Sequence, residues 1–247
     1  DYQRSRGLGD VYKRQDFTRA KETIKFIKDK KWNSALKSAS KVKDREFRDL
    51  IDWMYLKTTR NGASFSEYKN FIEQNSEYPR INRIRFLAEG KIYLRNNSPT
   101  SIINWFDKYP PLGGMGKIKL AEAYLEKGQT EKVQELIKEG WETATISKND
   151  LGYYRAKFKK FIDSEDHIKR ADYLAWEKKY WDLKRMLKYL PKDQRALYNA
   201  RQILMSNSYG VDNAISKVPE YLKKDPGLEF DRLRCCLLYT SPSPRDR

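Results

Sequence analysis

The sequence predicts an all-α fold, in which about twelve helices stack as antiparallel pairs into a superhelix. Three observations predict this fold class. Apolar residues recur at spacings of three and four along nearly the whole chain, which is typical of amphipathic helices. The breaks between these stretches are short and rich in Gly, Asn, Pro and Ser. No convincing alternation of apolar and polar residues indicates a β-strand.

Each expected helix is marked by an apolar stripe that combines a Trp, Tyr or Phe with aliphatic residues. In the first half of the chain the stripes lie at 32–42, 50–57, 65–72, 84–93 and 102–106. In the second half they lie at 118–125, 133–141, 153–161, 173–176, 181–190, 196–204 and 211–222. Stripes of this width need a partner surface, so each predicted helix packs against its neighbours.

The boundaries carry helix-stop and helix-start residues. Stops are expected at Asn61-Gly62, 96–99, Gly128 and 207–210. Four residues are expected to be N-caps: Ser64, Ser98, Ser164 and Asp212. Glu165 and Asp166 then fall in a first helical turn, where acidic side chains are favourable to the helix dipole.

The repeat is irregular. Residues 116–129 resemble the first helix of a tetratricopeptide repeat, and residues 30–39 resemble a second one. The roughly 34-residue period of that repeat does not hold between them. We therefore expect a superhelix of degenerate pairs and not a regular array.

Composition excludes several classes of protein. The 247 residues include 17 Tyr, 10 Phe and 6 Trp, which argues against a disordered chain. No apolar run is long enough for a membrane-spanning helix, and no export signal is visible. The single histidine, His167, and the adjacent Cys235 and Cys236 lack the spacing of a zinc site or a catalytic triad. We expect no metal and no cofactor.

Three motifs invite a catalytic interpretation and each has a simpler one. Gly113-Gly114-Met115-Gly116 lacks the Gly-Lys-Ser/Thr of a phosphate loop, so a loop that enters a helix is expected. His167 has no identifiable nucleophile or orienting partner and is interpreted as structural or surface-exposed. Glu165-Asp166 are adjacent on a helix and project in different directions, unlike the carboxylate pair of a glycosidase.

The chain is strongly basic, with 51 Lys and Arg against 34 Asp and Glu. Its cations interleave with aromatic residues in three segments, 157–161, 178–181 and 184–186, and such surfaces attract polyanions. No helix-turn-helix, ribonucleoprotein motif or zinc-finger spacing is present. A solvated basic surface is the preferred interpretation, and nucleic-acid binding is not expected.

Both ends of the chain resemble translated sequencing adapters. Asp10 to Gln15 back-translate to a transposase mosaic end, and Cys236 to Ser241 back-translate to its reverse complement. Residues 1–15 and 236–247 are therefore expected to be non-native, and 16–235 to be one helical domain. The cysteine pair then says nothing about the redox compartment. Apolar surface is expected to be uncovered near Asp16 and Arg234.

Six phrases, in order, resemble the N-terminal helical domain of the soluble lytic murein transglycosylases. They are Asp52-Trp53 with Phe65, Tyr68 and Phe71; Pro79 with Arg85, Ala88 and Glu89; Ile103, Trp105 and Phe106 with Tyr109-Pro110-Pro111, Gly116, Leu120 and Ala121; Asp166-His167 with Arg170, Asp172, Leu174 and Trp176; Asp193 with Arg195-Ala196-Leu197 and Ala200-Arg201; and Val218-Pro219 with Pro226-Gly227-Leu228 and Asp231-Arg232-Leu233-Arg234. Ala175 stands where the family commonly has Leu, and Gln194 is inserted.

The resemblance implies a periplasmic enzyme that cleaves the β-1,4 bond between N-acetylmuramic acid and N-acetylglucosamine, with a 1,6-anhydro product. The family uses one catalytic Glu, in a Glu-Ser pair of a separate C-terminal lysozyme-like domain, and needs no cofactor. No Glu in this chain precedes a Ser, so no catalytic residue is assigned. The implied role is a non-catalytic scaffold whose partners are peptidoglycan strands and the missing catalytic domain.

Two alternatives stay open. The first is a tetratricopeptide-like scaffold that binds proteins, and the second is a basic helical repeat that binds RNA. Steep salt dependence of RNA binding would mark the second.

Overall fold

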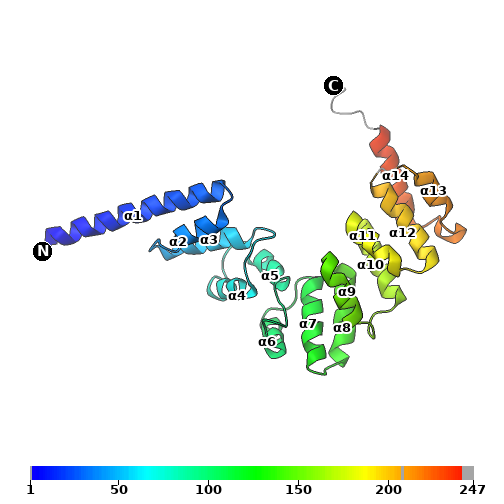
Figure 1. Cartoon of the computed structure of the whole chain (residues 1–247), viewed down its shortest axis with the longest axis horizontal. Helices are drawn as coiled ribbons and strands as arrows, with labels where there is room; N and C mark the ends of the chain where they lie inside the picture. Colours follow the sequence, from blue (N-terminus) through cyan, green and yellow to red (C-terminus); the bar gives the residue numbers. More distant parts are fainter. Residues whose placement is uncertain (1, 207–208, 241–247) are drawn as a thin grey trace. The chain divides into compact units, whose positions relative to one another are not determined.

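The computed structural model describes residues 2–206 and 209–240, and the side chains of 15–206 and 209–237. Throughout this described part the regular structure is helical, with α-helices and two short 3₁₀ helices (Figure 1). The predicted all-α class is confirmed. The chain divides into two compact units, residues 1–93 and 94–247.

The first unit holds five helices, blue to cyan in Figure 1. They are α1 (Tyr2–Lys28), α2 (Trp32–Ala39), α3 (Arg45–Leu56), α4 (Phe65–Gln74) and α5 (Ile81–Glu89). Each helix packs on the next one along the chain. The core of this unit is built from the predicted stripes, with Ile51, Tyr68, Ile72 and Ile84 each at most 1% exposed.

The second unit holds the remaining helices. They are α6 (Pro99–Lys108), α7 (Gly114–Glu126), α8 (Glu131–Thr143), α9 (Lys148–Lys157), α10 (Ser164–Trp176), α11 (Tyr180–Met186), η1 (Leu187–Tyr189), α12 (Lys192–Met205), α13 (Val211–Ser216), η2 (Glu220–Leu222) and α14 (Pro226–Thr240). Figure 1 shows α7 and α8 side by side as an antiparallel pair.

Each of the twelve predicted stripes overlaps a helix, but the stripes 32–42, 84–93 and 153–161 run past the ends of α2, α5 and α9, and the structure adds two more helices, α1 and α14. The sequence did not predict α1 because this helix offers little apolar periodicity. Phe17 and Ile24 on α1 are 61% and 45% exposed, and its buried position near them is Thr23. On α14, Phe230 and Leu233 are 46% and 61% exposed, so uncovered apolar surface is present on both terminal helices.

Two of the four predicted N-caps are confirmed and two are wrong. Ser64 and Ser98 cap α4 and α6, and Ser64 forms a capping box with Glu67. Ser164 instead lies inside α10, because the Asp163 carboxylate accepts bonds from the backbone N–H groups of Glu165 and Asp166. Asp212 lies in the first turn of α13, which begins at Gly210 in a left-handed conformation (φ 92°).

Three of the predicted breaks are observed. The Asn61 side chain donates hydrogen bonds to the carbonyls of Tyr55 and Thr58 and ends α3, and Gly128 has a positive φ of 73° after α7. Segment 96–99 separates α5 from α6. Of the expected break at 207–210, residues 207–208 lie outside the described part. No helix among the described residues is long and apolar enough to span a membrane.

Candidate functional site

His167 is a core residue. It is 9% exposed, and its ring centroid lies 5.6 Å from that of Trp141 and 5.9 Å from that of Tyr189. Burial, and next the nearby Arg155, lowers its pKa. Its Nδ1 atom is buried without a hydrogen-bond partner. The histidine therefore packs as a core side chain between two aromatic rings, where burial favours its neutral form, in agreement with the structural interpretation.

The glycine cluster serves helix packing. Gly113 is the N-cap of α7, and Gly114 and Gly116 are buried inside that helix. A β-carbon at Gly114 would lie 2.5 Å from the backbone nitrogen of Ala144, and one at Gly140 would lie 2.9 Å from the carbonyl oxygen of Gly114. The loop predicted at 113–116 thus ends at Gly113, and the later glycines let α7 and α8 approach closely.

Glu165 and Asp166 do not form a catalytic pair. Asp166 is 4% exposed, and its carboxylate accepts a hydrogen bond from the backbone N–H of Asp163, which completes a capping box. Lys138 lies 3.7 Å from the Asp166 carboxylate, whereas Glu165 pairs with Lys169 at the surface. Both carboxylates are committed to the start of α10.

Among the described residues, no group of three or more His, Cys, Asp and Glu side chains could hold a metal ion. Polar side chains converge around a buried arginine in the second unit and in a pocket of the first.

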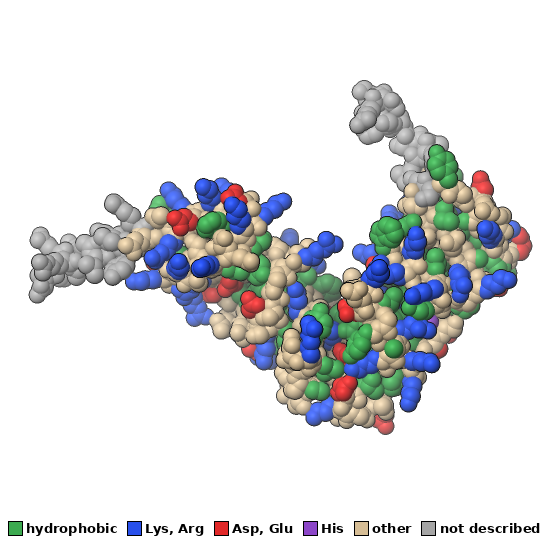
Figure 2. Space-filling view, in the orientation of Figure 1, with side chains coloured by type: hydrophobic (Ala, Val, Ile, Leu, Met, Phe, Trp, Pro, Cys, Tyr) green, Lys and Arg blue, Asp and Glu red, His purple; other side chains and the backbone are tan. Residues whose placement is uncertain are grey.

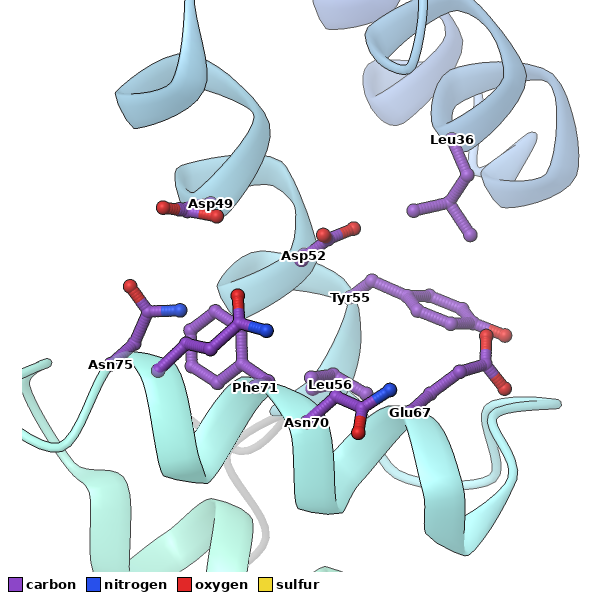
Figure 3. A pocket seen from close by; sticks show the side chains of 10 residues that line it. Leu36, Asp49, Asp52, Tyr55, Leu56, Glu67, Asn70, Phe71 and Asn75 are labelled. Atoms are coloured by element: carbon purple, nitrogen blue, oxygen red, sulfur yellow. The ribbon is translucent and has the colours of Figure 1, made fainter.

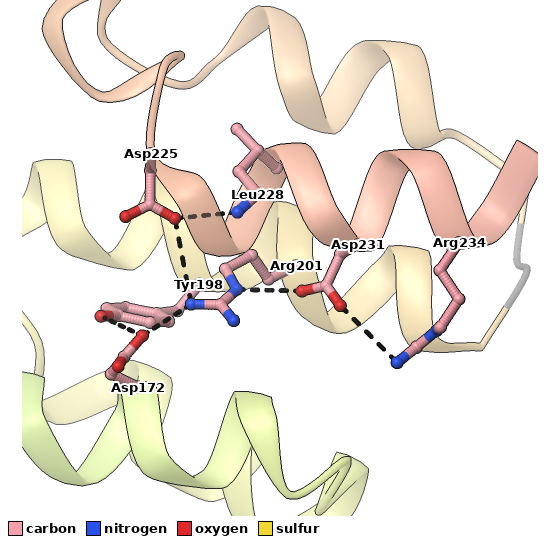
Figure 4. Close-up of polar contacts among 7 residues, drawn as sticks. All are labelled: Asp172, Tyr198, Arg201, Asp225, Leu228, Asp231 and Arg234. Carbon is pink, nitrogen blue, oxygen red and sulfur yellow. Dashed lines mark hydrogen bonds and ion pairs between the residues drawn. The ribbon is translucent and has the colours of Figure 1, made fainter.

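The buried arginine is Arg201 on α12, whose side chain is fully covered. Its Nε donates to the Asp231 carboxylate on α14 at 2.9 Å, and one terminal nitrogen donates to Asp172 on α10 at 2.7 Å (Figure 4). Asp225 lies 3.9 Å from the same terminal nitrogen. One guanidinium therefore joins three helices.

The surroundings of Arg201 hold it in its charged form. Burial alone would lower its pKa, but the hydrogen bonds and charges of Asp231 and Asp172 raise it above its ordinary value. The guanidinium carbon lies 5.1 Å from the Trp176 ring centroid and 5.6 Å from that of Tyr198. A fully covered guanidinium with these partners cannot reach a substrate, so this is a structural site.

Gly227 completes the Arg201 site. A β-carbon at this position would lie 2.3 Å from the Arg201 guanidinium, far inside van der Waals contact. Because Gly227 has no side chain, the Arg201 guanidinium can lie directly against α14. The pattern Pro226-Gly227 thus has a packing reason besides its place at a helix start.

The pocket of the first unit lies among α2, α3 and α4 and has a volume of about 240 Å³. Figure 3 shows Asp49, Asp52 and Glu67 around it with the rings of Tyr55 and Phe71. Burial, and next the charges of Asp49 and Glu67, raises the pKa of Asp52. The sequence does not predict this pocket, because Glu67 on α4 meets Asp49 and Asp52 of α3 only in the folded chain.

Two of the three carboxylates in the pocket already have structural partners. Asp49 lies 3.4 Å from Arg45, and Glu67 accepts bonds from the backbone and hydroxyl of Ser64. Asp52 is exposed. The arrangement does not provide the pair of a buried acid and a facing base that glycoside hydrolysis requires.

Only some residues of the three basic and aromatic segments lie on the surface of the second unit. Phe158 is buried within 157–161, whereas Trp181 is 66% exposed and is flanked by exposed Lys178, Lys179 and Lys184. Figure 2 shows Lys and Arg side chains over the visible face of each unit, with fewer Asp and Glu. This surface, and no buried cluster, is accessible to a large anionic partner.

No family model, no curated protein and no solved structure matches this chain.

Proposed function

We propose that this chain is the helical, non-catalytic part of a lytic transglycosylase that acts on peptidoglycan in the periplasm. Its role is to contact glycan strands and to carry the domain that holds the catalytic Glu. The observation that carries the proposal is the convergence of three of the six family-like phrases on Arg201. Asp172 comes from the fourth phrase, Arg201 from the fifth, and Gly227 and Asp231 from the sixth.

Chance matches to a family pattern would fall at positions without relation to each other. Here the matched Arg201 is the partner of two other matched residues, Asp172 and Asp231, each about thirty positions away in the sequence. The same holds in the first unit, where the Trp53 indole of the first phrase donates a 2.8 Å hydrogen bond to the carbonyl of Pro79 in the second. Residues that match the family pattern and also contact one another support an architecture shared with that family.

The charge of the chain suits the proposed substrate. Peptidoglycan strands carry lactyl and peptide carboxylates. The chain has a net charge of +17, of which +14 belongs to residues 16–235, and this charge attracts such a polyanion over several ångströms. The scaffold itself moves no proton and breaks no bond. Its contribution is to hold the strand by charge and shape while the catalytic domain acts.

Sedimentation of the purified chain with insoluble peptidoglycan tests this proposal. We expect the chain to pellet with the polymer at low salt and to be released as ionic strength rises, because exposed charge pairs are screened. Pelleting of a similar-sized acidic helical protein provides the control. Failure to pellet at low salt would overturn the proposal.

A second candidate function, a scaffold that binds proteins, is favoured by one observation. The ring centroids of Trp176 and Phe230 lie 5.3 Å apart in a tilted arrangement, both residues are 46% exposed, and Leu233 is 61% exposed. Exposed apolar surface of this kind often marks a protein contact. If a protein is captured through this surface and peptidoglycan is not bound, the second candidate replaces the first.

A further inference from the structure

We infer that an exposed stripe on α11 and η1, formed by Trp181, Lys184 and Lys188, is the surface on which the helical part holds an anionic glycan strand. The inference rests on the proposed function and deepens it by locating the contact. We call this surface the α11 stripe.

The α11 stripe is exposed because α11 packs on the core of the second unit through its other side. Leu183 and Met186 are fully buried and fix one side of the helix to the core of the second unit. Trp181, Lys184 and Lys188 recur at spacings of three and four and therefore lie on the opposite side, where all three are exposed. Helix packing leaves this row of side chains free for an external partner.

The indole of Trp181 is 66% exposed, and two neighbouring side chains pack against it. The Tyr180 ring meets it edge-on at 5.0 Å between centroids, and the Lys184 ammonium lies 5.4 Å from its ring. Within the described residues its indole N–H donates no hydrogen bond. A flat, positioned ring with a free donor suits the apolar face of a pyranose and one of its hydroxyls.

Cations continue along the α11 stripe. Lys188 lies 4.8 Å and Arg155 on α9 lies 4.3 Å from the Tyr189 ring centroid. Residues 176–188 carry five Lys and Arg against two acids, and one of those acids, Asp182, is paired with Arg185. The uncompensated ammonium groups complement the carboxylates of a glycan strand, which is the charge argument for this occupant.

Single-stranded nucleic acid fits the α11 stripe less well. Such ligands are held by several rings on which successive bases stack. The second ring of this surface, Tyr189, is half-buried, whereas Trp181 is 66% exposed, so the α11 stripe offers one largely exposed ring for stacking. One ring beside a row of ammonium groups matches a sugar next to a carboxylate.

The test measures binding of the full chain to insoluble peptidoglycan at low salt. We expect W181A to weaken binding about tenfold, and K184E/K188E to weaken it about tenfold with a difference that shrinks at high salt. W181F should retain most of the binding, since it keeps a stacking ring. The matched controls are Y221A, which removes another exposed ring, and K127E/K132E, which reverses two exposed charges near the α7–α8 turn; both should bind as the parent chain does.

The outcomes separate the two proposals. If the parent chain pellets and the α11 variants pellet equally well, the α11 stripe is not the contact and the proposed function stands. If the parent chain does not pellet, the proposed function fails and this inference fails with it. If single-stranded RNA binds more tightly than peptidoglycan and depends on the same three residues, the glycan assignment is overturned.

Discussion

At the residue scale, Gly227 shows how a single missing side chain permits a buried charge. A methyl group there would meet the Arg201 guanidinium at 2.3 Å. We expect G227A to lower the free energy of unfolding by about 1–3 kcal/mol, because the arginine must move within a packed site. G152A is the matched control, since a β-carbon at Gly152 on α9 meets nothing within 4 Å.

Urea denaturation of both variants measures this difference. The control should be neutral or more stable by about 0.5 kcal/mol, as expected for Gly to Ala in an exposed helix. Equal stability of G227A and G152A would contradict the close approach of Arg201 to α14.

His167 makes stability depend on pH. Burial lowers its pKa in the folded state, so the unfolded chain binds a proton at a higher pH than the folded chain does. The contribution of His167 to stability is therefore complete above its unfolded pKa of about 6.5 and is lost as the pH falls through the folded value.

H167F isolates this contribution, because Phe fills the space between Trp141 and Tyr189 without a titrating group. We expect the parent chain to lose stability between pH 7 and pH 5, and H167F to lose less over the same interval, as measured by thermal unfolding. Parallel pH profiles for the two proteins would contradict the burial of a neutral imidazole.

At this scale, the sequence predicted the character of single residues better than their partners. The sequence already indicated that His167 has no catalytic partners, since it is the single histidine of the chain and no motif supplies a nucleophile for it. The ion pair of Arg201 with Asp231 was not visible, because the two residues are thirty positions apart and only the fold brings them together. Local spacing carries no information on such a contact.

At the scale of elements, Arg201 joins α10, α12 and α14, and its loss should cost more than an ordinary ion pair. Asp231 is 2% exposed, so R201M leaves a buried carboxylate without its main partner. We expect a loss of about 3–5 kcal/mol in the free energy of unfolding. R185M, which removes a partly exposed pair with Asp182, should cost about 1 kcal/mol or less.

Denaturation curves for R201M, R201K and R185M provide the measurement. R201K keeps the charge but cannot span two carboxylates with one planar group, so an intermediate loss is expected. If R201M costs no more than R185M, the three helices are not held by this residue.

The apolar periodicity of the sequence predicted where helices form, but it predicted only some of the residues at which they begin. Ser64 was predictable because its capping box with Glu67 is local in sequence. Asp163 and Ser164 are both good caps, and the choice between them depends on which side chain meets two free backbone N–H groups. The terminal helices α1 and α14 escaped prediction because α1 offers little apolar periodicity and because residues 2–15 and 236–240 are interpreted as adapter-derived.

At the scale of the whole molecule, the all-α class followed directly from the sequence, since stripes and short breaks determine it. The pocket among α2, α3 and α4 did not, because its lining residues come from three helices. The six family-like phrases connect the sequence pattern with contacts in the folded chain. Where side-chain contacts are described, the phrases supply partners to one another, as Trp53 does with Pro79 and Arg201 with Asp172.

The sequence of the genomic locus through and beyond the codon for Arg234 shows whether this helical region belongs to a lytic transglycosylase. We expect the reading frame to continue into a domain of about 150 residues that carries a Glu-Ser pair on a helix. That result would make this chain the scaffold of an enzyme that cleaves peptidoglycan. A stop codon directly after the helical region, or an unrelated domain, would contradict the account.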